Sequence, residues 1–493
     1  MLRRSAHNSV PIPHTHSTTL GAPSLPRFLR IGWASIILLI GFLIILFCNT
    51  AEARTRPSYG GTLRVEVEGD PLDPGGIARR MVFDGLTQVD SPGEIRPALA
   101  VRWTSENNNH RWQFWLRSGV NFHNNKPLNA LAVFTSLEDS CRKVTCPWTA
   151  IHISAQSVVF TSDDPIPNLT SLLAEDAYLI RQQASPDDPA TPSANPLFAG
   201  TGPFHIKDSN GNTVHLEAND DCWQGRPFVD AIEILSHRAV RDQWTDFEAG
   251  KADIVEVRPS DIRQARQQRL NVTVSPVVSL LALQIDNTSL APQLRASIAA
   301  AVDRAALYQV LFQKQGEVTA SLLPNALTGY SFLFPTDRDL AHALALRGGL
   351  TPPPLTLSFN GASGLQLAAE RLALNLRDAG FTVRVNSLQR ADLALKAWPL
   401  NGGSPSAALQ AMLRNFGPNP PVIPEDPSAA YKLEQEFLAQ HTVIPLLYLP
   451  RAWAVSSRVR DLRITVEGVP DFADLSVPAP ALSAPVPSSE AAP

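Results

Sequence analysis

The sequence is poor in the residues that most often carry catalysis or metal binding. Its 493 residues include 4 Cys, 11 His and 3 Met, and charged residues make up 18% of the chain. It contains no G-x-S-x-G nucleophile elbow, no H-E-x-x-H pair, no P-loop and no G-x-G-x-x-G that opens a helix. These absences argue against the common hydrolase, metalloprotease and nucleotide-binding classes. We therefore expect no catalytic residue, no metal site, no cofactor and no enzymatic activity.

Four cysteines are too few for a disulfide-rich scaffold, but two of them lie close together. Cys141 and Cys146 are five residues apart. An oxidising compartment would favour a local disulfide between them. Two free thiols are the main alternative, and a zinc site would find only His152 nearby. Of these, we expect the disulfide, and we expect Cys222 to be a small buried residue.

Long apolar runs are absent except near the N-terminus. Residues 1–30 carry four Arg and no acidic residue, and an uncharged apolar run follows from Ile31 to Cys48. Ala51-Glu52-Ala53 then offers small residues for cleavage after Ala53. We expect residues 1–53 to be a signal peptide that directs the chain to the periplasm or cell envelope. The alternative is an uncleaved N-terminal anchor, because the run is just long enough to span a bilayer.

Excess positive charge is also lacking. Without residues 1–53, 38 basic and 45 acidic residues remain, which gives a net charge of -7. Nucleic-acid binding requires a basic face, so we expect no nucleic-acid partner. A hydrophobic content of 44% over this length is typical of two or three globular domains with large cores.

The first half of the chain reads mainly as strands. Thr62 to Val67 alternates as a strand does, and Leu72-Asp73-Pro74 then turns the chain. Asn129 is placed to cap a helix that runs through Lys143. Further strands are expected at 101–104, 110–116, 204–206, 214–217 and 231–235, and a helix at 242–249 before Gly250.

From Leu281 the pattern changes to alternating strands and helices. Strands are expected at 281–285, 355–359, 381–385 and 444–449, and helices at 293–313, 340–347, 365–379 and 431–439. Asp303 is placed to cap a second helix inside the range 293–313. The strand-helix-strand order implies parallel strands joined by a crossover helix, and hence an α/β unit. Residues 476–493 are rich in Pro, Ala and Ser, and we expect a disordered tail.

In this order, these segments resemble family 5 of the extracellular solute-binding proteins, which serve peptide and nickel import systems. The resemblance covers most of residues 59–475. It is carried by GGTLRVEVEGDPLDP, FDGLTQVD, IRPALAVRW, WQFWLRSGVNFHNNKPLNALAV, GTGPFHI, ANDDCWQGRPFVDAIEI, FEAGKADIV, LRASIAAAVDRAAL, AERLALNLRDAGFTVRV and VIPLLYLPRAWAVSSRVRDLRI.

The resemblance implies an α/β periplasmic-binding-protein-like fold of type II, with mixed sheets, helices on both faces and a cleft between two lobes. Lobe I would comprise residues 57–280 and 441–475, and lobe II residues 281–440. The chain would cross between the lobes near Leu281–Asp286 and His441–Tyr448, where a hinge is expected.

The ligand-binding segment of this family carries a Trp, an Asp three residues later, and then an Asp-Pro pair. The matching stretch here runs from Ala397 to Pro405, but Asn401 and Ser404 occupy the two acidic positions. The resemblance implies ligand contacts from Trp398, Asn401, Gly402, Gly403 and Ser404, and from Leu72 and Asp73 in the other lobe. Because Asn carries no charge, anchoring of a peptide's α-amino group would differ from that in the family. The ligand has no free amine, or another acid such as Asp73 or Asp392 replaces the missing one, or binding is weak and hydrated.

These residues lead us to expect a monomeric exported receptor. It would capture an oligopeptide or related small molecule by hinge closure and deliver it to the permease of an ABC importer. One alternative is the same fold with a non-peptide ligand, such as a metal chelate, haem or an opine-like compound. A membrane-tethered sensor is another.

Overall fold

A computed structural model describes residues 59–478, apart from 91–92, 184–197, 329–333, 360–363, 387–390, 403 and 418–420. The expected signal peptide, Gly403 and residues 479–493 of the expected tail lie outside the described residues. In the described ranges, no helix combines the length and the apolar character needed to cross a bilayer.

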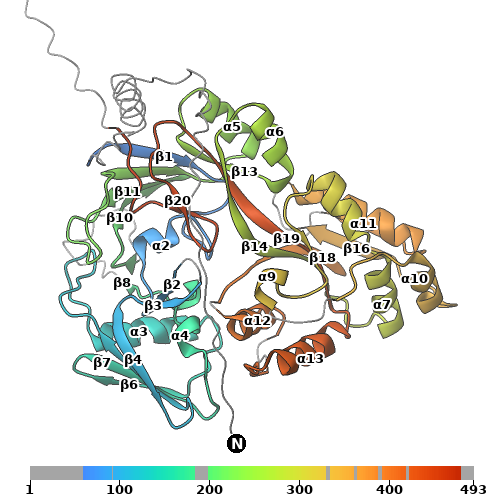
Figure 1. The fold of residues 1–493 in the computed structure, drawn as a ribbon, viewed down its shortest axis with the longest axis horizontal. Helices are drawn as coiled ribbons and strands as arrows, with labels where there is room; N and C mark the ends of the chain where they lie inside the picture. Colours follow the sequence, from blue (N-terminus) through green and yellow to red (C-terminus); the bar gives the residue numbers. More distant parts are fainter. Residues whose placement is uncertain are drawn as a thin grey trace, which may run out of the picture. The chain divides into compact units, whose positions relative to one another are not determined.

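One long mixed sheet runs through both lobes (Figure 1). Its order is β10-β11-β12-β1-β13-β19-β14-β18-β16-β17, and β15 adds to β19. The strands are β1 Thr62–Glu66, β10 Phe204–Asn210, β11 Thr213–Ala218, β12 Ala231–Leu235, β13 Ile254–Val257, β14 Val272–Ile285, β15 Glu317–Val318, β16 Leu355–Phe359, β17 Val383–Asn386, β18 Leu393–Pro399 and β19 Val443–Val455.

Helices cover both faces of this sheet. In the first lobe, α5 (Val240–Glu248) and α6 (Ile262–Gln267) lie on one face and α2 (Arg79–Val82) on the other. In the second lobe, α7 (Pro292–Ala301), α10 (Leu340–Arg347) and α11 (Leu365–Asp378) pack on one face. On the opposite face lie α12 (Pro405–Arg414) and α13 (Pro427–Leu438). The described chain is thus an α/β protein with two lobes, as expected.

A second, smaller sheet belongs to the first lobe and has its own core. Its order is β4-β5-β7-β6, formed by Ala100–Glu106, Arg111–Leu116, Ser157–Thr161 and Ala150–Ser154. Trp112, Phe114 and Leu116 alternate along β5 and are all buried, so they form its inner face. Helix α3 (Ala130–Cys141) packs on this sheet, and the short α4 (Leu169–Leu172) contributes to the same core.

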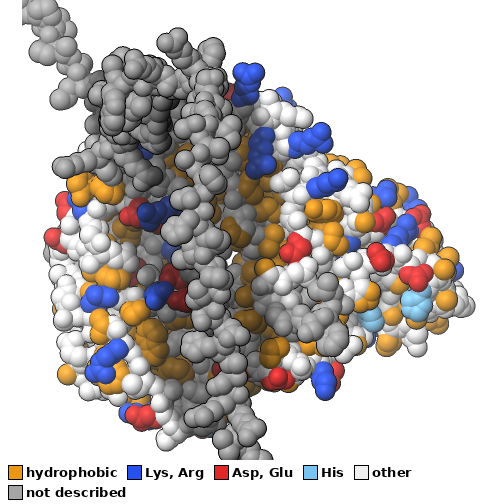
Figure 2. Space-filling view, in the orientation of Figure 1, with side chains coloured by type: hydrophobic (Ala, Val, Ile, Leu, Met, Phe, Trp, Pro, Cys, Tyr) orange, Lys and Arg blue, Asp and Glu red, His pale blue; other side chains and the backbone are white. Residues whose placement is uncertain are grey.

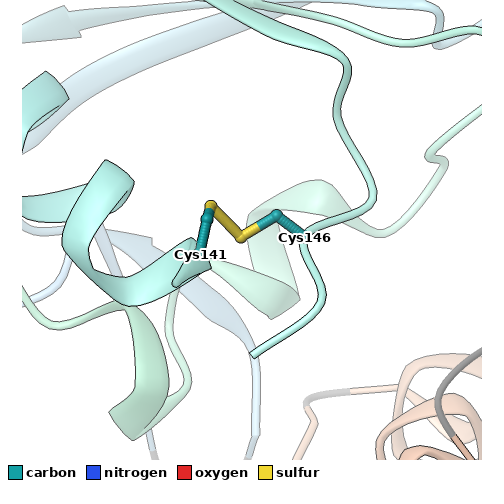
Figure 3. Close-up of a disulfide and its surroundings, with 2 residues drawn as sticks. All are labelled: Cys141 and Cys146. Atoms are coloured by element: carbon teal, nitrogen blue, oxygen red, sulfur yellow. A yellow bond between two sulfur atoms is a disulfide. The ribbon is translucent and has the colours of Figure 1, made fainter. Parts of the chain in front are cut away.

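Helix α3 ends at the disulfide shown in Figure 3. The structure joins Cys141 and Cys146, with a distance of 5.4 Å between their Cα atoms, whereas Cys222 is free and buried. At the other end, the Asn129 side chain accepts a hydrogen bond from Ala132 N at 2.9 Å, as predicted for a cap. The helix stops at Cys141 rather than at the expected Lys143.

The second lobe contains the predicted strand-helix-strand unit. Strands β16 and β17 are parallel and joined by α11, and β18 adds a third parallel strand. Asp303 accepts a hydrogen bond from Ala306 N at 2.8 Å and caps the short helix α8 (Arg304–Ala306), as expected. The helical range expected over 293–313 is divided after Ala301, where Val302 adopts an extended conformation, and the second helix begins after Asp303.

The two lobes share the long strands β14 and β19. Along β14, Val272 and Val274 pack with the first lobe, whereas Leu280 to Ile285 pack with the second. Along β19, Leu449 belongs to the second lobe and Ala452 to the first. The core therefore changes near Pro276 and Pro450, later along β19 than the expected boundary at 441. The crossings expected at 281–286 and 441–448 came from the family resemblance along the sequence, which does not show which core each residue joins.

The described chain also remains packed past residue 475. Ser476 N donates a hydrogen bond to Arg460 O, Arg460 N donates one to Ser476 O, and Val477 is 1% exposed. The packed region thus extends beyond the expected start of the tail at 476, because Val477 is an apolar residue that packs against Gly61.

Candidate functional site

The loop after β1 carries Leu72 and Asp73, the two ligand residues expected in the first lobe. Several hydrogen bonds fix its backbone. Gly75 N donates to Asp176 Oδ2 at 2.7 Å, and Gly75 O accepts from Arg451 Nη1 at 2.9 Å. Arg79 Nη1 donates to Leu72 O at 2.8 Å. Asp73 is exposed at the turn and Leu72 packs partly on the core, so only Asp73 offers a free charge to a ligand.

Trp398 lies near the end of β18 and is partly buried. Its ring meets Phe416 edge to face, with 5.2 Å between the ring centroids, and it packs on the core between β14, α12 and α13. Its indole Nε1 is buried and has no hydrogen-bond partner in the described part of the chain. A buried N–H without an acceptor is costly. Trp398 therefore contributes to the core while keeping one donor unsatisfied.

Residues 401–404 connect β18 to α12. Gly402 has a φ of +106°, and a Cβ atom there would lie 2.6 Å from Ala408 N. Ser404 Oγ accepts a hydrogen bond from Ala407 N at 3.3 Å and caps α12. Both residues thus have structural roles that the sequence left open. Asn401 is partly exposed, and Gly403 lies outside the described residues.

Asp392, one of the acids expected to replace the missing one at Asn401, is held by hydrogen bonds within the second lobe. Asp392 Oδ2 accepts hydrogen bonds from Thr356 N and Oγ1 at 2.8 and 2.7 Å, and Oδ1 accepts one from Asn287 Nδ2 at 2.8 Å. It precedes β18 at the end opposite to Trp398. The structure therefore assigns Asp392 to linking strands within the second lobe.

A cavity of about 220 Å³ lies between the lobes, next to the shared strands. The first lobe contributes acidic and basic side chains to its wall, and the second contributes small residues together with Phe312, Leu365 and Leu449. The polar and small residues of the lining include Glu68, Glu256, Arg258, Arg451, Ser279 and Ala397. Concave sites between lobes with a few convergent polar groups are typical ligand sites.

Glu256 and Arg451 set the charge in this cavity. Glu256 Oε2 accepts a hydrogen bond from Glu68 N at 2.6 Å. Burial raises the pKa of Glu256, an effect partly offset by that hydrogen bond and by the charge of Arg451. Burial also lowers the pKa of Arg451, and the charge of Glu256 opposes this shift. The cavity thus contains a partly desolvated carboxyl group at Glu256 and a partly desolvated guanidinium at Arg451, in addition to Glu68 and Arg258 in its wall.

Glu256, Arg258 and Arg451 were not among the site residues expected from the sequence. Glu256 and Arg258 alternate with Val255 and Val257 at the end of β13, and that pattern of charges within an apolar strand was the available signal. Arg451 follows Pro450 in β19, far away in sequence. Only the sheet order brings β13 beside β19 and so places their side chains at one cavity.

The lobes also touch directly on the side where α12 faces α4. Arg414 Nη1 donates to both carboxylate oxygens of Glu175 at 3.0 Å, and Asn168 Nδ2 donates to Gln410 Oε1 at 3.2 Å. Burial raises the pKa of Glu175, and the charge of Arg414 opposes this shift. We call these four residues the interlobe clasp.

A further groove, of about 630 Å³, lies between α6 and residues 309–314. Figure 2 shows Lys and Arg side chains over α6 and α11 on this side of the molecule. The lining consists of long polar side chains, such as Arg263, Gln267 and Lys314, with one exposed Val310. It lacks the enclosed apolar wall of a small-molecule site. Elsewhere in the described ranges, no group of three or more His, Cys, Asp or Glu residues is arranged to hold a metal ion.

The chain is similar to several proteins of known name. The 24%-identical "Nickel-binding protein NikA" of Staphylococcus aureus aligns over 64% of this chain and 67% of its own. A "Probable di/tripeptide-binding protein 5" of Pseudomonas aeruginosa is 23% identical over 69% of this chain and 75% of its own. Among solved structures, the murein tripeptide binding protein MppA of Escherichia coli superposes with a TM-score of 0.74 at 17% identity. This match covers 86% of this chain and 99% of MppA, and it shows the shared fold.

The family model "Bacterial extracellular solute-binding proteins, family 5 Middle" matches residues 94–425. This range includes the second sheet, the shared strand β14 and the segment from Trp398 to Ser404. Together with the two-lobed fold, the match shows that the chain belongs to family 5 of the bacterial extracellular solute-binding proteins.

Proposed function

We propose that this protein is an exported receptor that binds an oligopeptide or related small molecule between its lobes and delivers it to an ABC importer. The main observation behind this proposal is the cavity that contains Glu256 and Arg451. Its lining combines opposite charges from the first lobe with side chains from the second. A zwitterionic ligand would complement both charges. Relatives that are named for di- and tripeptide binding support this ligand class.

In this proposal, closure of the lobes is the step that the ligand controls. A ligand that contacts both lobes only in the closed form shifts the open–closed equilibrium by its differential affinity for that form. Ser279 and Ala397 would meet the ligand from the second lobe, and Glu256 and Arg451 from the first. The permease would then recognise the closed arrangement.

We further propose that Glu256 replaces the family acid that is missing at Asn401. A carboxylate that accepts hydrogen bonds from an ammonium group gains a charge-assisted bond. Glu256→Gln should therefore weaken the binding of a free-amine tripeptide by about tenfold. Isothermal titration calorimetry with a free tripeptide and its N-acetylated form tests this assignment, with Glu138→Gln as the control for an exposed acid that does not line the cavity. An equal loss for both peptides would show that Glu256 does not bind the amine.

A second candidate function is binding of a non-peptide ligand such as a metal chelate. Asn401 and Ser404 favour it, since the two acidic positions of the family's peptide site carry no charge here. One relative is named for nickel binding. Mass spectrometry of the ligand that copurifies from the native host distinguishes the two candidates, because it identifies peptide or chelate directly.

The mass of the mature chain decides between export and tethering, since cleavage after Ala53 leaves Arg54 as the first residue.

A further inference from the structure

The second lobe buries an arginine that has no acidic partner. Arg304 begins helix α8 and is 6% exposed. Its Nε donates one hydrogen bond, to Pro445 O at 2.8 Å. No carboxylate in the described part of the chain forms an ion pair with it. Burial lowers the pKa of Arg304 to about 10, and no neighbouring charge offsets this shift. The guanidinium is therefore a desolvated cation with unused donors.

Arg304 lines a cavity of about 530 Å³ that lies within the second lobe. Helix α7 leaves space for this cavity, because it presents Ala296, Ala299 and Ala300 there. Other walls come from Phe334, Leu438 and the start of β19 at Val443–Pro445. None of these residues lines the cavity between the lobes. The site is thus a mainly apolar chamber with the buried Arg304 guanidinium in its wall, and its other polar lining residues are Asp337, Asp339, His342 and His441.

The Arg304 guanidinium and the apolar walls together favour one class of ligand. A buried charge without a partner is expensive, and the planar guanidinium fork matches a carboxylate in a bidentate arrangement. The alanine and Phe334 walls suit an alkyl or aryl body. Asp337 and Asp339 also line the cavity but are exposed, and Asp339 Oδ1 accepts a hydrogen bond from His342 N. These two acids would repel an ion of high negative charge, such as phosphate.

We propose that this cavity binds a small monocarboxylate with a short apolar body, whose carboxylate pairs with the Arg304 guanidinium. The site is separate from the solute cleft and lies on the far part of the second lobe, among α7, α10 and the start of β19. It would give the protein a second ligand, whose binding stabilises the second lobe by mass action.

The test is calorimetry on the purified mature protein with sodium hexanoate, its neutral analogue hexanamide and inorganic phosphate. We expect hexanoate to bind and hexanamide and phosphate to bind at least tenfold more weakly. Ala296→Leu should fill the chamber from α7 and weaken hexanoate at least tenfold while leaving Arg304 in place. Ala345→Leu is the matched control, because Ala345 is exposed on α10 and does not line the cavity. It should keep the wild-type affinity.

Arg304→Gln removes the charge and should also weaken hexanoate at least tenfold. If that variant does not fold, the comparison of Ala296→Leu with Ala345→Leu decides the question alone. Equal binding of hexanoate and hexanamide would overturn the role of the charge. Unchanged hexanoate binding in Ala296→Leu would place the ligand elsewhere and overturn the proposal, as would phosphate binding more tightly than hexanoate.

Discussion

At the scale of single residues, His123 shows how packing fixes a protonation state. Its Nδ1 accepts a hydrogen bond from Gly200 N at 3.3 Å, and its Nε2 lies 3.0 Å from Gly202 O. Nδ1 must therefore be unprotonated, while Nε2 carries the hydrogen. Burial lowers the pKa of His123 to about 4, and the hydrogen bond to Gly202 opposes this shift only partly.

This arrangement predicts an acid-sensitive contribution to stability. The folded-state pKa lies below the unfolded value near 6.5, so the unfolded chain binds more protons between these values. The contribution is present above about pH 6.5 and is lost as the pH falls toward 4. Lowering the pH from 7 to 5 should therefore reduce the free energy of unfolding by about 2 kcal/mol. Denaturant unfolding at several pH values measures it. His123→Gln should flatten the profile in this window, and an unchanged slope would contradict the assignment.

Asn401 remains the residue through which the family's amine anchor could be restored. It is partly exposed and lies two residues after the end of β18. If it lines the ligand site, Asn401→Asp should strengthen the binding of a free-amine tripeptide by several-fold, because it adds a charge-assisted hydrogen bond. Calorimetry with the free and N-acetylated tripeptides measures the gain. A gain shared by both peptides, or none at all, would remove Asn401 from the amine site.

At the scale of elements, the turn between β18 and α12 depends on one glycine. Position 402 has a positive φ, which residues other than glycine disfavour. A Cβ atom there would also lie too close to Ala408 N. Gly402→Ala should destabilise the protein by about 3 kcal/mol, since strain and steric overlap add. Gly417→Ala is the control, because a Cβ atom there has open space around it. Thermal unfolding of the two variants measures the difference, and equal melting temperatures would show that the turn relaxes freely.

Elements with strong local signals were predictable from the sequence. The strand Leu355–Phe359 and the helix Leu340–Arg347 match their expected bounds, and the caps Asn129 and Asp303 act as predicted. Each depends on neighbouring residues only. Strand β18 and helix α12 were missed, because the segment from Trp398 to Pro405 was interpreted through its family role as a ligand loop.

The candidate site was less predictable than the elements. Trp398, Asn401 and Ser404 came from a resemblance along the sequence, whereas Glu256, Arg258 and Arg451 come together only through strand order. No local sequence pattern predicts the long-range pairing of β13 with β19. Similarly, the end of α7 at Ala301 is set by the extended backbone at Val302, which gave no glycine or proline signal.

At the scale of the whole molecule, the interlobe clasp joins the two lobes directly. Glu175 and Arg414 are largely buried, with side chains 14% and 25% exposed. Breaking such a pair leaves an uncompensated charge. If the described arrangement is the closed form, Glu175→Gln should shift the protein toward the open form and weaken ligand binding by about tenfold.

The clasp can be tested without relying on one variant. Arg414→Met should produce a similar loss, and the double variant should lose much less than the sum of the two, because the pair is already broken. Small-angle X-ray scattering with and without ligand measures closure, and calorimetry measures affinity. Fully additive losses would show that Glu175 and Arg414 do not act as a pair. Arg96→Met is a control, since its ion pairs with Asp90 and Glu94 are exposed.

The position of β19 in the sheet also determines the order of assembly as the chain is made. This strand fills the place between β13 and β14 and pairs with both, although it is made almost 160 residues after β14 ends. Until residues 443–455 emerge, the sheet stays split along its middle, with two unpaired edges. A translation product that stops before this point should not form a stable sheet. In a full-length chain, β13 and β14 should be protected from protease, whereas a chain that ends before residue 443 should leave both strands open to cleavage.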